Sequence, residues 1–224
     1  MLIIASVAVW FIKLQEKPEE TENHSPWEDL KEGLQYARKN EVVISIVMMA
    51  LFLNFFFSGS FSIGMPIIVK DIFQGSAVSL AIIQMSMGIG ALIGAIVLAS
   101  IKLKRPGVVM IGSLIVLAIL YTATGFSVHL MITAGLVAIM ALMTQLVNIP
   151  LITMLQQTTE KRMLGRMMSF LMTVSTGLIP VSYVATSFLI AAGIGIQTII
   201  IVSGVNVTLL AGYNLKNKKI LSFR

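Results

Sequence analysis

Long apolar blocks separated by short polar connections occupy most of the chain after residue 41. A bilayer core about 30 Å thick is crossed by a helix of roughly 20 apolar residues, and six blocks reach that length. They cover residues 42–69, 76–101, 107–127, 129–154, 164–190 and 194–214. Barrel strands are only about ten residues long and alternate in polarity. The pattern therefore predicts an all-α membrane protein with a six-helix transmembrane domain over residues 42–214.

A shorter apolar run occupies residues 1–13 and ends in Lys13. At 1.5 Å per residue its apolar part spans about 18 Å, which is too short to cross a bilayer. A signal peptide carries its positive charge before the apolar stretch, whereas here the charge follows it. We interpret residues 1–13 as the truncated end of a preceding transmembrane helix, with a surface-lying anchor as the alternative.

The linker, residues 14–41, is polar and contains an amphipathic pattern over residues 26–40. Trp27, Leu34 and Ala37 recur at helical spacing, and the opposite face is charged. We expect a helix that lies along the inner membrane surface, with an ordinary solvated helix as the alternative.

The sixteen Lys and Arg residues are distributed unevenly if the six spans alternate in direction. Only Lys70 falls on one side; the others lie in the linker, in two connections and in the basic tail, residues 215–224. The positive-inside rule therefore predicts a multi-pass protein of the cell membrane, with the linker and tail in the cytoplasm. The net charge of +6 is then a bias that sets topology, and we do not expect nucleic acid as a partner.

Composition excludes several classes of protein. Apolar residues make up 57% of the chain and charged residues 12%, against roughly 25% charged residues in soluble proteins. This excludes a soluble globule and a disordered chain, and the lack of Cys excludes disulfide scaffolds and thiolate metal sites. We find no phosphate-binding glycine loop, zinc-protease motif or nucleophile elbow. We therefore expect no enzymatic activity, no cofactor and no bound metal.

Ionisable side chains are absent from the middle of every predicted span, so this chain alone cannot build a proton relay there. The amides that remain are Asn54, Gln84, Gln145, Asn148 and Asn206. Burying an amide without a partner costs about 2–7 kcal/mol, so these side chains should face the bundle interior or a wet cavity. The first four are candidates for a solute pathway, with interhelical hydrogen bonds as the alternative. For Asn206 we favour the structural role.

Aromatic and methionine residues gather in the first two predicted spans and offer a soft apolar surface to a lipophilic ligand. Phe55, in the middle of the phenylalanine run, is therefore a further candidate for the pathway. The alternative is that these side chains face lipid or the core.

Glycine and proline mark packing and bending positions within the spans. Gly88, Gly90 and Gly94 give the second span a small-residue face with G-x-x-x-G spacing, which favours close helix packing. Proline removes a backbone donor and kinks a helix. We therefore expect Pro150 to interrupt the fourth span and Pro180, three residues after Gly177, to interrupt the fifth.

Several segments resemble one transporter family, in order and at suitable spacing. They are WEDLKEGLQYARKN (27–40), LFLNFF (51–56), GIGALIGAIVLA (88–99), NIPLITMLQQTTEKRMLGRMMSF (148–170) and GLIPVSYVATSFL (177–189). They are similar to the C-terminal half of major facilitator superfamily exporters, in the branch of macrolide-efflux and siderophore-export permeases. The resemblance implies a fold equivalent to half of a twelve-helix transporter, with the first half absent.

The resemblance also implies a cytoplasmic gate. The family's loop between the second and third helices of a half usually carries an Asp followed by basic residues. The stretch SIKLKR (100–105) keeps Lys104 and Arg105 but lacks the acid. Arg166, after Gly165, matches the Gly-Arg pair that the family places at the start of its eleventh helix.

The function implied is secondary active export of small amphipathic or lipophilic solutes, drug-like or siderophore-like, from a bacterial cell. Transport would be coupled to proton entry and would use alternating access with a missing N-terminal half or with a second copy. The alternatives are a non-transporting membrane module and an inactive truncated remnant that associates with another membrane protein.

Overall fold

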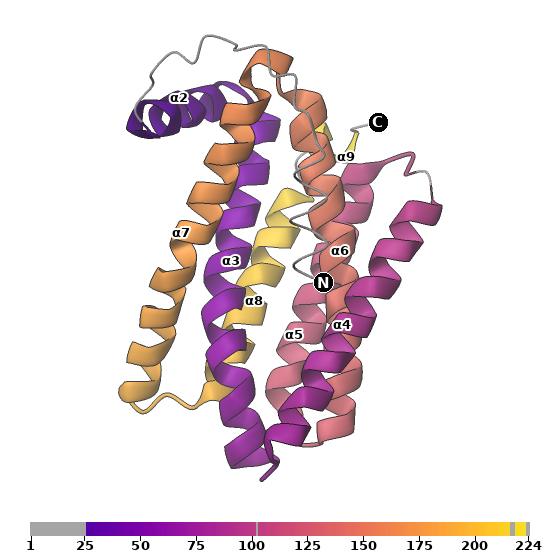
Figure 1. Ribbon diagram of the computed structural model, residues 1–224, viewed down its shortest axis with the longest axis vertical. Helices are drawn as coiled ribbons and strands as arrows, with labels where there is room; N and C mark the ends of the chain where they lie inside the picture. The colour runs from indigo at the N-terminus through magenta and orange to yellow at the C-terminus, as the bar shows by residue number, and fades with distance from the viewer. Residues whose placement is uncertain (1–25, 102, 216–217, 223–224) are drawn as a thin grey trace, which may run out of the picture.

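The computed structural model describes residues 26–101, 103–215 and 218–222. The predicted helix remnant at residues 1–13 and residues 14–25 of the linker lie outside this part, as does the side chain of Trp27. Figure 1 shows a bundle of long helices with a short helix, α2 (Pro26–Lys39), lying across one end.

Six helices in the described residues are long and apolar enough to cross a membrane. They are α3 (Glu41–Ile67), α4 (Ala77–Ser100), α5 (Pro106–Phe126), α6 (Leu130–Thr158), α7 (Leu164–Ala191) and α8 (Ile196–Asn214). The six-helix, all-α fold is therefore confirmed. The largest difference from the expected bounds is at the end of α6, which continues to Thr158 and not to residue 154.

Local chemistry fixes where these helices begin. The Asn40 side chain caps α3 by accepting hydrogen bonds from the backbone N–H groups of Val42 and Val43, at 3.0 and 3.4 Å. Ser76 and Ser79 form a reciprocal capping box at the start of α4. Pro106 occupies the first turn of α5, where its missing N–H costs no hydrogen bond.

The helices alternate in direction and separate the charges as predicted. One end of the bundle carries α2, the α4–α5 connection and the α6–α7 connection, and the other carries the turns after α3, α5 and α7 (Figure 1). Lys70 lies in the turn after α3. The described cations of the first end include Lys31, Arg38, Lys39, Lys104, Arg105, Lys161, Arg162 and Arg166.

The proline positions correct one expectation. Both α6 and α7 continue as α-helix through Pro150 and Pro180, so neither proline interrupts its span. The irregularity lies instead after Pro66 of α3, where the helix passes into a π-helical turn, η1 (Ile68–Ile72). There the Phe73 N–H donates to the Ile68 carbonyl at 3.0 Å, a wider turn of the kind that often accompanies function.

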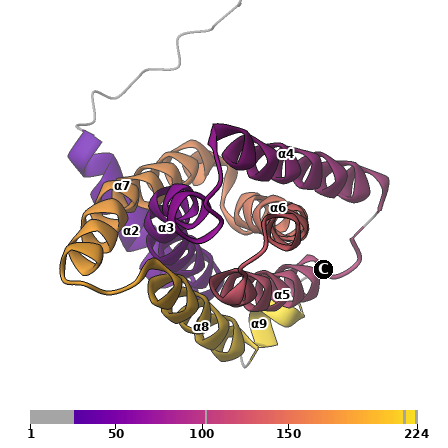
Figure 2. The same ribbon diagram turned by 90° about the horizontal axis from the view of Figure 1, so that it is seen from below.

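The six helices form two closely packed groups. In the first, α3 packs on α7 and α8; in the second, α6 packs on α4 and α5, and α5 joins the groups through α8 (Figure 2). A buried hydrogen bond of 2.6 Å between the hydroxyls of Ser60 and Tyr121 also ties α3 to α5. Contacts between α3 and α6 are sparse. This leaves a groove on the side of the bundle where α3 and α4 flank α6.

Candidate solute groove and the end of the bundle

Three adjoining pockets form one groove between α3, α4 and α6. Their volumes are about 100, 210 and 460 Å³. Phe57 and Thr144 line both the first and the second pocket. Phe61 and Met87 line both the second and the third. The groove therefore runs along the bundle from the Asn148 region of α6 to the Gln84 region of α4.

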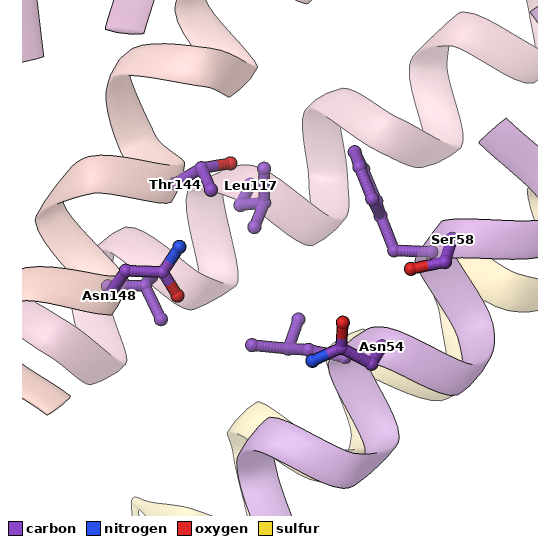
Figure 3. A pocket seen from close by; sticks show the side chains of 8 residues that line it. Asn54, Ser58, Leu117, Thr144 and Asn148 are labelled. Atoms are coloured by element: carbon purple, nitrogen blue, oxygen red, sulfur yellow. The ribbon is translucent and has the colours of Figure 1, made fainter. Parts of the chain in front are cut away.

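The first pocket has hydrogen-bonding groups on both sides (Figure 3). Asn54 and Ser58 come from α3, and Thr144 and Asn148 from α6. The Asn54 amide nitrogen donates to the Ala50 carbonyl at 2.9 Å, which leaves its amide oxygen to accept. Asn148 is exposed, and within the described part of the chain its side chain makes no hydrogen bond. Both amides are therefore available to a solute.

Two further predicted residues line the same groove. Gln145 faces the second pocket together with Phe57 and Phe61. Gln84, which is exposed, lines the third pocket. The structure thus brings together all four amides that the sequence assigned to a pathway.

Phe55 does not belong to this groove. It lines a separate pocket with residues of α7 and α8, because it lies on the side of α3 away from Asn54. Asn206 also differs from its expected role: its side chain donates to the Val202 carbonyl of its own helix at 2.8 Å, and not to a neighbouring helix.

Sequence analysis missed several groove residues. Ser58 and Ser62 follow Asn54 at intervals of four, so all three lie along one stripe of α3. Thr144 precedes Asn148 by the same interval on α6. This repeat of small polar residues was the signal available in the sequence.

The small-residue face of α4 includes only two of its three predicted glycines. Gly90 lies against the backbone of Ala138, and a Cβ on Gly94 would lie 2.9 Å from the Leu142 carbonyl oxygen. A Cβ on Gly88 would meet no atom within 4 Å, because Gly88 lines the third pocket. Gly177 of α7 is likewise exposed and open. Within the described residues, neither Gly88 nor Gly177 therefore contacts a neighbouring helix closely.

Arg166, one of the gate candidates, fastens α2 to the start of α7. Its guanidinium donates to the Glu32 carboxylate at 2.6 Å. The Tyr36 hydroxyl accepts from the backbone N–H of Glu160 at 3.2 Å, and Gly33 lets α2 approach Phe170 closely. Glu32 belongs to the charged face of the predicted amphipathic helix, and its pairing with Arg166 was not predicted from the sequence.

The other gate candidates do not join this cluster. Lys104 and Arg105 are exposed in the α4–α5 connection, on the opposite side of the bundle from α2 (Figures 1 and 2). On α2 itself, Ala37 is buried whereas Leu34 is 37% exposed. The helix therefore uses its small residues to pack on α7 and turns Leu34 outward.

The groove suits binding more than chemistry. Its lining consists of amides, hydroxyls, phenyl rings and methionine. Within the described residues, no three His, Cys, Asp or Glu side chains gather where they could hold a metal ion. An open groove with a few polar groups among apolar side chains is typical of a small-molecule site.

The fold and groove define a multi-pass membrane protein with a solute-sized groove among its spans. Residues 1–183 match the Major Facilitator Superfamily. The chain therefore belongs to this superfamily, whose members are membrane transporters and not enzymes. No curated protein and no solved structure matches the chain.

Proposed function

We propose that this chain supplies one wall of the solute pathway of a secondary exporter, and that the groove between α3, α4 and α6 is that wall. The observation that carries the proposal is the first pocket. There Asn54 and Asn148 face a common space from two helices that hardly touch. An amide inside a span that lacks a hydrogen-bond partner costs free energy when it faces lipid. We therefore expect these two side chains to contact water or solute.

The groove lining favours a small amphipathic solute. Phe57, Phe61 and Met87 offer apolar, polarisable contacts, while Gln145 and Asn148 offer hydrogen bonds. The outward direction and the drug-like or siderophore-like class rest on the resemblance to efflux permeases. Glu41 and Asp71 lie at the ends of the first span and are exposed, so the carboxylate for proton coupling is assigned to a second unit.

The open side of the groove requires that second unit. Asn148, Gln84 and Ser62 are exposed there, and none of them is suited to lipid. A second six-helix unit facing the groove would enclose the solute, and rocking of the two units would alternate access. We place the end that carries α2 and the basic connections in the cytoplasm.

Cysteine accessibility tests the groove directly, because the natural chain contains no cysteine. Asn148→Cys and Gln84→Cys are expected to react in native membranes with a membrane-impermeant methanethiosulfonate reagent. The matched control is Ile119→Cys on α5, whose side chain is 55% exposed but apolar. It is expected to stay unreactive because lipid covers it. If both groove cysteines are as inert as the control, the groove is not a hydrated pathway.

A flux measurement tests the need for a second unit. The purified chain, reconstituted alone in liposomes with an imposed proton gradient, is expected to show no proton-coupled movement of radiolabelled erythromycin, an amphipathic macrolide. Robust flux would contradict the half-pathway role. In that case crosslinking would decide whether two copies of this chain form the complete carrier.

A further inference from the structure

A second pocket lies on the other side of α3, between α7 and α8. Its volume is about 260 Å³. The residues that carry the argument are Phe55, Phe56, Ser182, Thr186, Thr198 and Ser203. Because α7 and α8 make few contacts with each other, α3 forms the floor of this pocket. Figure 2 shows that α3 separates the α7–α8 side from the side where α4 lies.

Two largely buried residues of this pocket carry hydroxyls that have no hydrogen-bond partner within the described chain, and neither hydroxyl oxygen is fully enclosed. Thr186 of α7 is 5% exposed and Ser203 of α8 is 6% exposed, and neither side chain makes a hydrogen bond there. A neighbouring hydroxyl is satisfied: Ser182 accepts from the Gly59 N–H at 2.8 Å and donates to the Phe55 carbonyl. Polar groups inside native proteins normally have partners, and because these two oxygens stay accessible, a molecule in the pocket can supply the missing hydrogen bonds.

The remaining lining defines the chemistry of that ligand. Phe55 and Phe56 meet edge to face, with ring centroids 5.1 Å apart, and present an apolar surface. The other lining side chains are aliphatic or carry hydroxyls. Such a pocket disfavours an ionised group, because it offers no countercharge to offset desolvation. A neutral molecule with an apolar body and a single oxygen function meets both requirements.

The position of the pocket agrees with a ligand that comes from the bilayer. Leu189, near the end of α7, and Ile194, just before α8, both line it. The pocket therefore lies in the membrane half nearest the α7–α8 turn. There the chain of a lipid-like molecule can enter sideways between the helices while its oxygen meets the two hydroxyls.

We propose that the α7–α8 pocket binds a neutral, single-chain lipid-like alcohol, held by hydrogen bonds to Thr186 and Ser203. This site is separate from the solute groove and does not depend on transport. The probe is octanol with a diazirine on its chain, applied to the full chain in lipid nanodiscs. Its matched control is the diazirine-bearing octane, which has the same chain but no hydroxyl.

Photolabelling followed by peptide mass spectrometry reads out the site. The alcohol probe is expected to form adducts on residues that line the pocket, such as Leu189, whereas the octane probe labels them about fivefold less. That ratio corresponds to the loss of one net hydrogen bond. Excess unlabelled octanol, but not octane, should reduce the adducts in the natural chain. Equal labelling by the two probes, or no adducts in the pocket, would overturn the proposal.

Conservative variants test whether the hydroxyls of Thr186 and Ser203 bind the alcohol. Thr186→Val and Ser203→Ala should each lower labelling by the alcohol probe towards the level of the octane probe. Thr208→Val is the control on α8, because the Thr208 hydroxyl bonds to the Gly204 carbonyl of its own helix at 2.9 Å. Unchanged labelling in both pocket variants would contradict the proposal. If one variant loses its helical circular dichroism, the other variant and the competition measurement still decide.

Discussion

Two glycines of α4, Gly88 and Gly90, lie only two residues apart but have different surroundings. At Gly90 the helix is pressed against the backbone of α6, with no room for a side chain. At Gly88 it is open, and that face borders the groove towards α3. The difference shows that the groove does not result from loose packing of the helices around it. It is held open because α4 is anchored on α6 and α3 is anchored on α7.

The strongest test of this comparison is Gly90→Ala against Gly88→Ala. A methyl group at Gly90 would overlap the Ala138 carbonyl oxygen, so α4 and α6 must separate. We expect a loss of about 1–3 kcal/mol in the free energy of unfolding, measured by circular dichroism during titration with sodium dodecyl sulfate. Gly88→Ala should be neutral or slightly stabilising. Equal destabilisation by both variants would show that the faces are alike.

Gly59→Ala extends the test to the crossing of α3 and α7. Its methyl group would overlap the backbone of Ser182. We expect destabilisation in the lower part of the same range, about 1–2 kcal/mol, because the overlap with backbone is smaller here than at Gly90. Gly177→Ala, which meets no atom within 4 Å, is the control on α7. The same denaturant titration measures both variants, and an unchanged Gly59→Ala would place the anchor of α3 elsewhere.

Tyr121→Phe sharpens the comparison at the buried link between α3 and α5. The substitution removes the hydroxyl that shares a 2.6 Å hydrogen bond with Ser60. It keeps the ring, whose centroid lies 4.8 Å from the centroid of the Phe57 ring. Ser60 also donates to the Phe56 carbonyl, so it does not become unsatisfied. We expect a loss of about 1 kcal/mol. A loss as large as that of Gly90→Ala would contradict this ranking.

The smallest expected effect on stability comes from Glu32→Gln. Arg166 and Glu32 are 29% and 42% exposed, and partly exposed ion pairs contribute only about 0–1 kcal/mol. The expected change lies instead in the position of α2. Trypsin should cleave after Lys31 or Arg38 faster than in the natural chain, whereas Asp71→Asn, in the turn after α3 at the other end of the bundle, serves as the charge control. Unchanged cleavage would mean that this pair does not hold α2.

Much of the fold could be predicted from the sequence because apolar length alone determines a membrane span. The lack of ionisable groups in mid-span made the four groove amides easy to find. Which side of a helix each residue occupies was harder to predict. Phe55 and Asn54 are adjacent in the sequence but face different pockets. A span that is apolar on all sides has no polar face to indicate which side of the helix packs on its neighbours.

Two features were not predicted, and for different reasons: the continuity of the helices at their prolines and the pairing of Arg166 with Glu32. A proline in a long span need not end the helix, because neighbouring helices and local adjustment satisfy the freed backbone group; α6 continues through Pro150 in this way. The partnership of Glu32 and Arg166 joins residues 134 positions apart. Local pattern carries no information about such a pair, because it arises only once α2 docks on α7.

The α3 helix has a molecule-sized space on each side, with the groove before it and the α7–α8 pocket behind it. The α3 residues that line the groove differ from those that line the pocket. Single substitutions on this one helix can therefore alter either cavity alone.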